Sequence, residues 1–336
     1  MNENIRLAEG GGGEATARLI KEVFWSRFRH PQLLRGNDAA VLEYGGGRLA
    51  LTTDAFVVTP WAFPGGDIGR LAIAGTVNDL TMMGATALGL TAAFIIEEGF
   101  ARADLERIAA SMADIAAAAG VDLVAGDTKV VRHGEADGIF ITTTGVGAIP
   151  AGVRLGGELA RSGDRVLITG SVGDHGAAIL LARNELGLSG SIESDVAPLN
   201  RLLLPLLADY PEALRVMRDP TRGGLATTLN EIARQSGVAI RLDEAAVPVQ
   251  PQVRGVCELL GLDPLYLANE GKAIIIVAPE AAEAVLAALR RQPLGAAAAL
   301  IGQVTAEQAG MVSMVTASGG ERIIPLGSGE QLPRIC

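Results

Sequence analysis

Apolar and polar residues follow two different periods along this chain, and the periods predict where helices and strands lie. Leu105 and Ile108 begin an apolar face with helical spacing, so residues 103–119 are predicted to form an amphipathic helix that ends at Gly120. The apolar run 80–96 is interrupted by glycine and threonine and is slightly short for a membrane span. It is therefore predicted to be a buried helix that leads into a buried strand.

Helical and strand patterns alternate through the rest of the chain. Further helices are predicted near residues 14–24, from about 68, from about 177, at 197–207, from about 224 and from about 281. Strands are predicted at 36–42 and 49–54, joined by a hairpin at 45–47, and at 121–130, 139–147, 166–169, 273–277 and 302–304. This order predicts an α/β (α+β) protein. The predicted parts are an N-terminal glycine-rich arm and helix (1–35), a first domain (36–150), a second domain (156–318) and a flexible tail (319–336).

Composition narrows the class of protein. The chain has 336 residues, 49% of them hydrophobic, which is ample for two packed cores. Its formal net charge of -10, without clusters of basic and aromatic residues, argues against binding to nucleic acid. Two cysteines, one of them Cys257 in an apolar helical pattern, and no basic leader before an apolar run favour a reducing cytoplasm, with no membrane association and no structural disulfide. An anionic ligand would have to bind through backbone N–H groups and a divalent cation.

Three aspartates stand at the ends or edges of separate predicted elements. Asp38 and Asp54 lie at strand ends, and Asp79 follows Asn78 in the helix that begins near residue 68. Each alone is more often a turn or cap residue. Together, and close to Thr53, they form the oxygen-rich pattern that suits Mg²⁺ bridging to phosphate.

Other motifs leave two interpretations open. Glycine-rich turns at 10–13 and 170–176 each open a helix, where they either contact phosphate or serve as an arm and an ordinary strand-to-helix turn. In the run 219–225, Thr221 or Asp219 is expected to cap the next helix. Glu270 is either a turn-capping acid or a functional one.

The strand after Gly120 ends in a second polar motif. Gly126 permits a close backbone approach, Asp127 can contact metal or water, and Lys129 is a rare cation beside that acid. The three histidines of the chain are isolated, and no His/Cys spacing suggests zinc.

The chain ends on a thiol. The run 327–332 is of a flexible composition, so Cys336 is expected to travel on a mobile tether into a site or between sites. A random tail that happens to end in cysteine is the alternative. Cys257 is expected to be a core residue.

Several motifs share an order and spacing over nearly the whole chain. They lie at 36–41, 52–54, 78–80 with 82–84, 126–128, 219–225 and 269–271, and the chain ends in Pro-Arg-Ile-Cys at 333–336. The motif set resembles the aminoimidazole ribonucleotide synthetase (PurM-like) superfamily of ATP-using enzymes. The ending narrows the resemblance to the HypE family of hydrogenase maturation factors, the carbamoyl dehydratases.

This resemblance implies a fold and a reaction. It implies a homodimer that pairs N-terminal sheets into a barrel, a C-terminal α/β domain, and ATP with Mg²⁺ in a cleft between the domains. A partner, HypF, would place a carbamoyl group on the terminal thiol. ATP would then drive dehydration of the thiocarboxamide to a thiocyanate, and cyanide would pass to iron on the HypC–HypD complex for nickel–iron hydrogenase. Two alternative hypotheses of function are a small-molecule kinase or ligase of the same superfamily and an ATP-gated scaffold.

The same resemblance assigns expected roles. Cys336 would carry the substrate group, Lys129 would stabilise developing charge, and Glu270 would take a proton from nitrogen. Asp79 is expected among the catalytic residues as well as the metal ligands. The metal ligands are expected to be Asp38, Asp54, Asp79 and Asp127, and the nucleotide site to include Asp38, Thr53, Asp54, Asn78, Gly126, Asp127 and Thr128.

Overall fold

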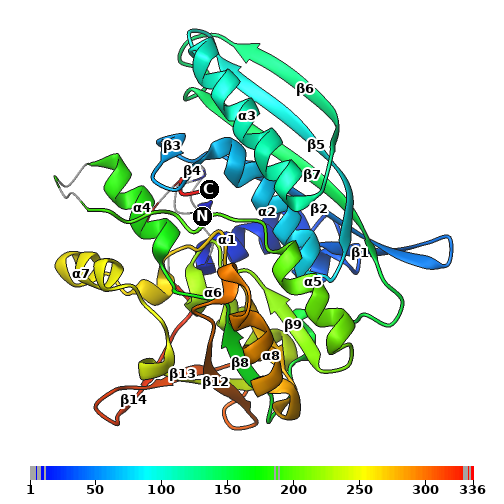
Figure 1. Cartoon of the computed structure of the whole chain (residues 1–336), viewed down its shortest axis with the longest axis vertical. Helices are drawn as coiled ribbons and strands as arrows, with labels where there is room; N and C mark the ends of the chain where they lie inside the picture. The colour runs from blue at the N-terminus through cyan, green and yellow to red at the C-terminus, as the bar shows by residue number, and fades with distance from the viewer. Residues whose placement is uncertain are drawn as a thin grey trace.

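The computed structural model describes residues 5, 9–10, 13–184, 187, 190–327, 332 and 334–336. Two sheets with their helices lie one above the other, and the C-terminus lies between them (Figure 1). The middle of the predicted glycine run at 10–13, most of the predicted hinge at 327–332, and Pro333 fall outside the described residues. No described helix is long and apolar enough to cross a membrane.

The first sheet has five strands in the order β1-β2-β7-β5-β6, antiparallel except for the β5–β6 pair. The strands are β1 (Ala40–Tyr44), β2 (Gly47–Phe56), β5 (Thr86–Glu97), β6 (Leu123–Val131) and β7 (Ile139–Ile149), with a two-stranded ribbon of β3 (Ala62–Phe63) and β4 (Gly66–Asp67) beside it. Gly45 and Gly46 take positive φ in the predicted β1–β2 hairpin.

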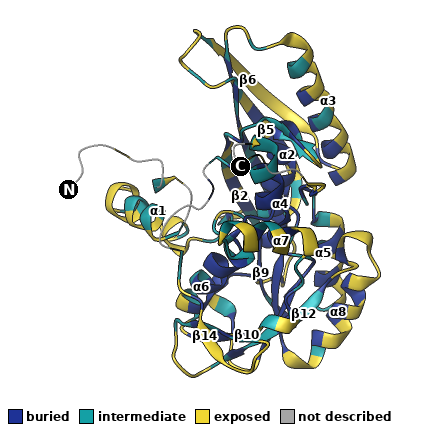
Figure 2. Ribbon diagram, turned by 90° about the vertical axis from the view of Figure 1, so that its left-hand side faces the viewer, coloured by how far each residue is buried: buried dark blue, intermediate teal, exposed yellow. Residues whose placement is uncertain are grey.

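Helices α2 (Ile68–Met82) and α3 (Arg102–Ala119) pack in this domain, and α2 is buried over almost its whole length. The side chain of Asp67 accepts the Arg70 N–H and caps α2, and Gly120 ends α3 in the left-handed conformation, as predicted. In contrast, eight of the nine residues of β6 are exposed. The sheet therefore ends in an uncovered edge strand, visible at the top of Figure 2.

The second sheet has seven strands in the order β14-β13-β10-β12-β8-β11-β9. They are β8 (Arg165–Ile168), β9 (Leu214–Arg218), β10 (Ala239–Asp243), β11 (Ile274–Val277), β12 (Ala299–Thr305), β13 (Val312–Val315) and β14 (Glu321–Ile323). The helices around it are α4 (Asp174–Arg183), α5 (Asn200–Asp209), α6 (Gly224–Ser236), α7 (Pro251–Leu260) and α8 (Ala282–Arg290). All four residues of β11 are buried, so its unbroken apolar pattern reflects a strand covered on both faces.

Several expectations need correction. The helix α6 is not capped by Thr221 or Asp219, because its N-cap is Gly223, with φ of 76°. The segment expected to be a flexible tail contains β14, which extends the second sheet. The predicted amphipathic N-terminal helix divides into α1 (Gly13–Leu19) and a π-helix (Ile20–Trp25), and neither has a buried residue. This arm projects from the side of the molecule in Figure 2. Cys257 lies buried in α7, as expected.

Candidate active site

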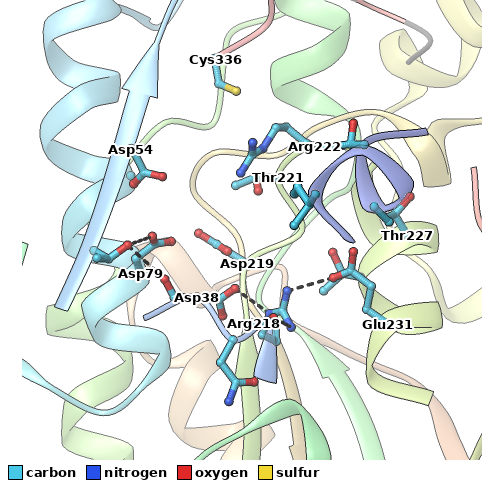
Figure 3. A pocket seen from close by; sticks show the side chains of 18 of the residues that line it. Asp38, Asp54, Asp79, Arg218, Asp219, Thr221, Arg222, Thr227, Glu231 and Cys336 are labelled. Atoms are coloured by element: carbon cyan, nitrogen blue, oxygen red, sulfur yellow. Dashed lines mark hydrogen bonds and ion pairs between the residues drawn. The ribbon is translucent and has the colours of Figure 1, made fainter. Parts of the chain in front are cut away.

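A pocket of about 660 Å³ lies where the two domains and the C-terminus meet. Asp38, Asp54 and Asp79 reach it from the first domain, and Cys336 projects its sulfur toward the same space (Figure 3). The second domain supplies a facing set, which is Arg218, Asp219, Thr221, Arg222, Thr227, Thr228, Glu231, Gln235 and Glu270. The N-terminal arm lines the opening with Gly13, Thr16, Ala17, Ile20, Lys21 and Trp25.

The three first-domain aspartates are held by neighbouring elements. The Thr52 hydroxyl on β2 contacts the Asp79 carboxylate at 2.5 Å and the Asp38 carbonyl at 3.1 Å, which ties α2 and the start of β1 to the sheet. Asp54 accepts a 3.4 Å hydrogen bond from Thr76, one turn before Asp79 on α2. Strand β2, helix α2 and the residues just before β1 therefore place these carboxylates on one wall of the pocket.

Burial raises the pKa of these carboxyl groups. The pKa of Asp79 lies well above its ordinary value, first because of burial and then because of the charges of Asp54, Asp219 and Asp38. Burial also raises the pKa of Asp54, and that of Asp219 to about 6. A cation in the pocket would relieve this crowding of negative charge.

Arg218 at the end of β9 balances part of the charge. Its Nε lies 2.6 Å from Asp38 Oδ1 and its Nη2 lies 3.0 Å from Glu231 Oε2. Burial nevertheless raises the pKa of Asp38 to about 8, against the lowering effect of Arg218. The second carboxylate oxygen of Asp38 is buried without a hydrogen-bond partner, so it is available to a ligand.

The turn between β9 and α6 directs Arg222 toward the terminal residue. A Cβ on Gly224, which has φ of 63°, would lie 2.5 Å from the Leu267 carbonyl oxygen, so only glycine fits this turn. The charge of Cys336 is the main cause that raises the pKa of Arg222. Arg222 therefore provides positive charge beside the thiol-bearing residue.

Glu270 is buried on the second-domain side of the pocket. Gly271 permits this placement, because a Cβ there would lie 1.8 Å from the Asp195 carbonyl oxygen. Burial, followed by the charges of nearby aspartates, raises the pKa of Glu270 well above its ordinary value. Its Oε1 is buried without a hydrogen-bond partner. Such a group is suited to holding and moving a proton.

The last residues of the chain dock through main-chain hydrogen bonds to residues 57–59. The Val57 N–H donates to the Cys336 carbonyl oxygen at 2.8 Å, and the Thr59 N–H donates to that of Arg334 at 3.2 Å. Arg334 returns a 2.9 Å hydrogen bond to the Val57 carbonyl and pairs with Asp137. The thiol is thus carried into the pocket by backbone pairing.

Some predicted site residues lie elsewhere. Asn78 is buried outside the pocket lining, where its amide contacts Ala197 O at 3.0 Å and Leu199 N at 2.8 Å, so it clamps the first domain to the second. Gly126, Asp127, Thr128 and Lys129 lie on exposed β6, outside the pocket of a single chain, and Lys129 pairs with Asp127 at 2.7 Å. Among the described residues, no group of three or more His, Cys, Asp or Glu is arranged to hold a metal ion. The structure therefore brings Asp38, Asp54 and Asp79 to one pocket without an arrangement that would hold a metal ion by itself, and it leaves Asp127 apart from them.

Sequence reasoning missed several pocket residues. Arg218, Asp219, Arg222 and Glu231 were not predicted as site residues, although the run 219–224 was prominent. That run is typical of an ordinary helix start. No signal in its local sequence indicates that it lies at the end of β9, opposite Asp38. Thr53, which was predicted, does line the pocket.

Comparisons with known proteins agree with this architecture. Residues 36–149 match the family model "AIR synthase related protein, N-terminal domain", and residues 161–314 match the C-terminal domain of the same family. The chain is 53% identical over 335 residues to "Carbamoyl dehydratase HypE" of Rhizobium leguminosarum bv. viciae, covering 100% of this chain and 96% of the relative. It is 48% identical over 338 residues to the protein of the same name from Escherichia coli K12, covering 99% of both.

Solved structures extend the similarity to three dimensions. A chain in the crystal structure of a HypE-HypF complex has a TM-score of 0.88 and 48% identity, covering 92% of this chain and 99% of that chain. Hydrogenase maturation protein HypE in complex with ATP has a TM-score of 0.82 and 50% identity, covering 98% of this chain and 100% of that chain. The chain therefore belongs to the AIR synthase related proteins and, within them, to the HypE carbamoyl dehydratase family.

Proposed function

We propose that this protein uses ATP to dehydrate a carbamoyl group carried on the thiol of Cys336. The single observation that supports this most directly is the docked C-terminus, which places Cys336 in the same pocket as Arg222 and the buried carboxylates. The thiocarboxamide R–S–C(=O)–NH₂ and ATP would give R–S–C≡N, ADP and phosphate. The product would supply cyanide for the iron of nickel–iron hydrogenase.

ATP fits the charge pattern of the pocket. A relative of 50% identity was crystallised in complex with ATP. On this chain, Arg218 and Arg222 line the pocket, and their guanidinium groups would pair with phosphate oxygens.

The residues also suit Mg²⁺ when phosphate oxygens complete its coordination. Support comes from the unpartnered Oδ2 of Asp38 and the raised pKa of Asp54 and Asp79. These three aspartates, which alone are not arranged to hold a metal, would hold the ion together with phosphate oxygens, and the ion would neutralise phosphate charge.

The chemistry assigns work to two further residues. An amide oxygen is a poor leaving group, and transfer of the ATP γ-phosphate to it makes phosphate the leaving group. Glu270, once ionised, would take a proton from the nitrogen as the C–O bond breaks, because a carboxylate with a raised pKa is a stronger base than an ordinary one. Arg222 would stabilise the negative charge on the oxygen before transfer.

Membership of the HypE family also suggests partner proteins for this chain. A HypE-HypF complex is known for a relative, so we propose HypF as the carbamoyl donor and a HypC–HypD complex as the cyanide acceptor. We also propose a homodimer built on the first sheet, since β6 is an exposed edge strand with apolar Leu123, Val124 and Val130. Asp127 and Lys129 would reach a nucleotide only through such an assembly, because they lie away from the pocket of their own chain.

The test is the intact mass of the protein after incubation with HypF, carbamoyl phosphate and ATP. We expect a carbamoyl-sized gain on the Cys336 peptide, followed by loss of one water only when ATP is hydrolysable. Cys336→Ala should retain ATP binding and accept no carbamoyl group, whereas the control Cys257→Ala, at a core position, should still accept it. ATP consumption on a free metabolite without an adduct would favour a small-molecule kinase or ligase. Stable tail docking without ADP formation would favour a scaffold.

A further inference from the structure

A buried histidine contacts the C-terminal segment from outside the pocket. His175 is the second residue of α4, and its side chain is fully buried. Its Nε2 lies 2.6 Å from the carbonyl oxygen of Ile335, and its Nδ1 lies 2.8 Å from the hydroxyl of Ser194. It does not line the pocket that holds Cys336.

The hydrogen bonds fix the tautomer of this ring. A carbonyl oxygen only accepts, so Nε2 carries the proton and donates to Ile335. In a neutral ring Nδ1 then accepts from the Ser194 hydroxyl, whose oxygen in turn accepts the Val196 N–H at 3.2 Å. Burial keeps the ring neutral by lowering the pKa of His175, an effect opposed by the charge of Asp195. Each polar atom in this chain of contacts therefore has one defined role.

The His175 contact involves the carbonyl that lies between the two carbonyls bound by residues 57–59. The carbonyl oxygens of Arg334 and Cys336 accept hydrogen bonds from the Thr59 and Val57 N–H groups. The carbonyl oxygen of Ile335 instead meets Nε2 of His175. Ile335 is 5% exposed, which leaves its carbonyl little access to water.

Ile335 is also the residue directly before the reactive position. Rotation of its peptide group would turn Cys336 in the pocket, and the contact with His175 opposes that rotation. Arg183 gives a second hold from the same helix by donating to the Arg334 carbonyl at 2.8 Å. Both contacts are to the main chain, so they fix position and direction independently of the group on the thiol.

We propose that His175 is a positioning residue that fixes the direction of the Cys336 thiol by binding the Ile335 carbonyl. This inference rests on the proposed function, since it concerns the group that would carry the carbamoyl. His175 itself touches no reacting atom.

The experiment compares His175→Leu, which has no donor, with His175→Gln, whose side-chain amide restores an N–H near the Nε2 position. The first readout is the rate at which a small alkylating reagent modifies Cys336 without nucleotide. The second is the single-turnover rate of water loss from the carbamoylated protein at saturating ATP. Exposed His30→Leu serves as the matched control.

In His175→Leu, we expect the reagent to modify Cys336 about tenfold faster than in the wild type. We expect the carbamoylated variant to lose water about tenfold more slowly. Both changes correspond to the loss of one hydrogen bond. ATP affinity should be unchanged, and His175→Gln should recover most of both rates. Unchanged alkylation in His175→Leu, or equal defects in the Leu and Gln variants, would overturn the proposal. If His175→Leu does not fold, Ser194→Ala tests the same contact by removing the hydroxyl that sets the tautomer, and we expect an alkylation rate about threefold higher. Failure of the wild-type protein to lose water would refute the proposed function, while the alkylation comparison would still decide the role of His175.

Discussion

Replacement of Glu270 by glutamine tests two roles of this residue, as proton acceptor in the reaction and as a buried carboxyl group that affects the stability of the fold. The change keeps the shape of the side chain but removes its charge and its ability to accept a proton. If Glu270 removes the nitrogen proton, water loss from the carbamoylated thiol should fall by about 10² to 10⁴-fold. ATP affinity should change little, because Arg218 and Arg222 remain.

The stability effect has a defined sign. Burial raises the pKa of Glu270 well above its ordinary value of 4.5, so the folded protein retains a proton that the unfolded chain has lost. The stabilising contribution of this group to the free energy of unfolding is fully present below about pH 4.5 and is lost as the pH rises through the folded pKa. Because one proton is involved, the free energy of unfolding changes by at most about 1.4 kcal/mol per pH unit. The glutamine variant lacks this dependence and should become relatively more stable as the pH rises.

The assay combines the two readouts on one set of proteins. Thermal unfolding of wild type, Glu270→Gln and the exposed control Glu280→Gln would be followed from about pH 4 to pH 8, across the window above the ordinary carboxyl pKa. Water loss would be measured by mass on the Cys336 peptide. Identical pH slopes for wild type and Glu270→Gln would refute the raised pKa, and an unchanged rate of water loss would refute the role as proton acceptor.

Three further changes test other parts of the site. Asp79→Asn should raise the Mg²⁺ concentration needed for half-maximal ADP formation at least tenfold, and an unchanged Mg²⁺ requirement would remove it from the metal ligands. Gly271→Ala should destabilise the fold by about 3 kcal/mol in thermal or urea unfolding, because its Cβ would lie 1.8 Å from the Asp195 carbonyl oxygen, and a wild-type midpoint would contradict that contact. Lys129→Ala should change stability by less than about 1 kcal/mol, since its pair with Asp127 is exposed, yet slow water loss about a hundredfold in the dimer. Wild-type water loss would exclude Lys129 from the reaction.

The sequence by itself determined the elements and much of the local chemistry. The helix at Arg102–Ala119, the hairpin at Gly45 and Gly46, and the buried helix leading into β5 follow from periodicity and glycine placement, which are local properties. Asp38, Asp54, Asp79, Glu270 and Cys336 were also predicted, and the structure places all five in one pocket. Carboxylates at element ends and the cysteine of a distinctive ending are visible in sequence as residue types, whereas their expected roles came from the family resemblance.

Only the tertiary structure decided which residues meet. Arg218 at the end of β9 pairs with Asp38 of the first domain and with Glu231 on α6, although Asp38 and Arg218 are far apart in the chain. Asn78 joins the two domains and residues 126–129 lie on an exposed strand, so the pocket of one chain contains neither motif, and their roles at the nucleotide site stay predictions. His175 is isolated in the sequence, but in the fold its Nε2 lies 2.6 Å from the carbonyl oxygen of Ile335. Such pairings depend on the path of the whole backbone, and no local pattern of residue types encodes that path.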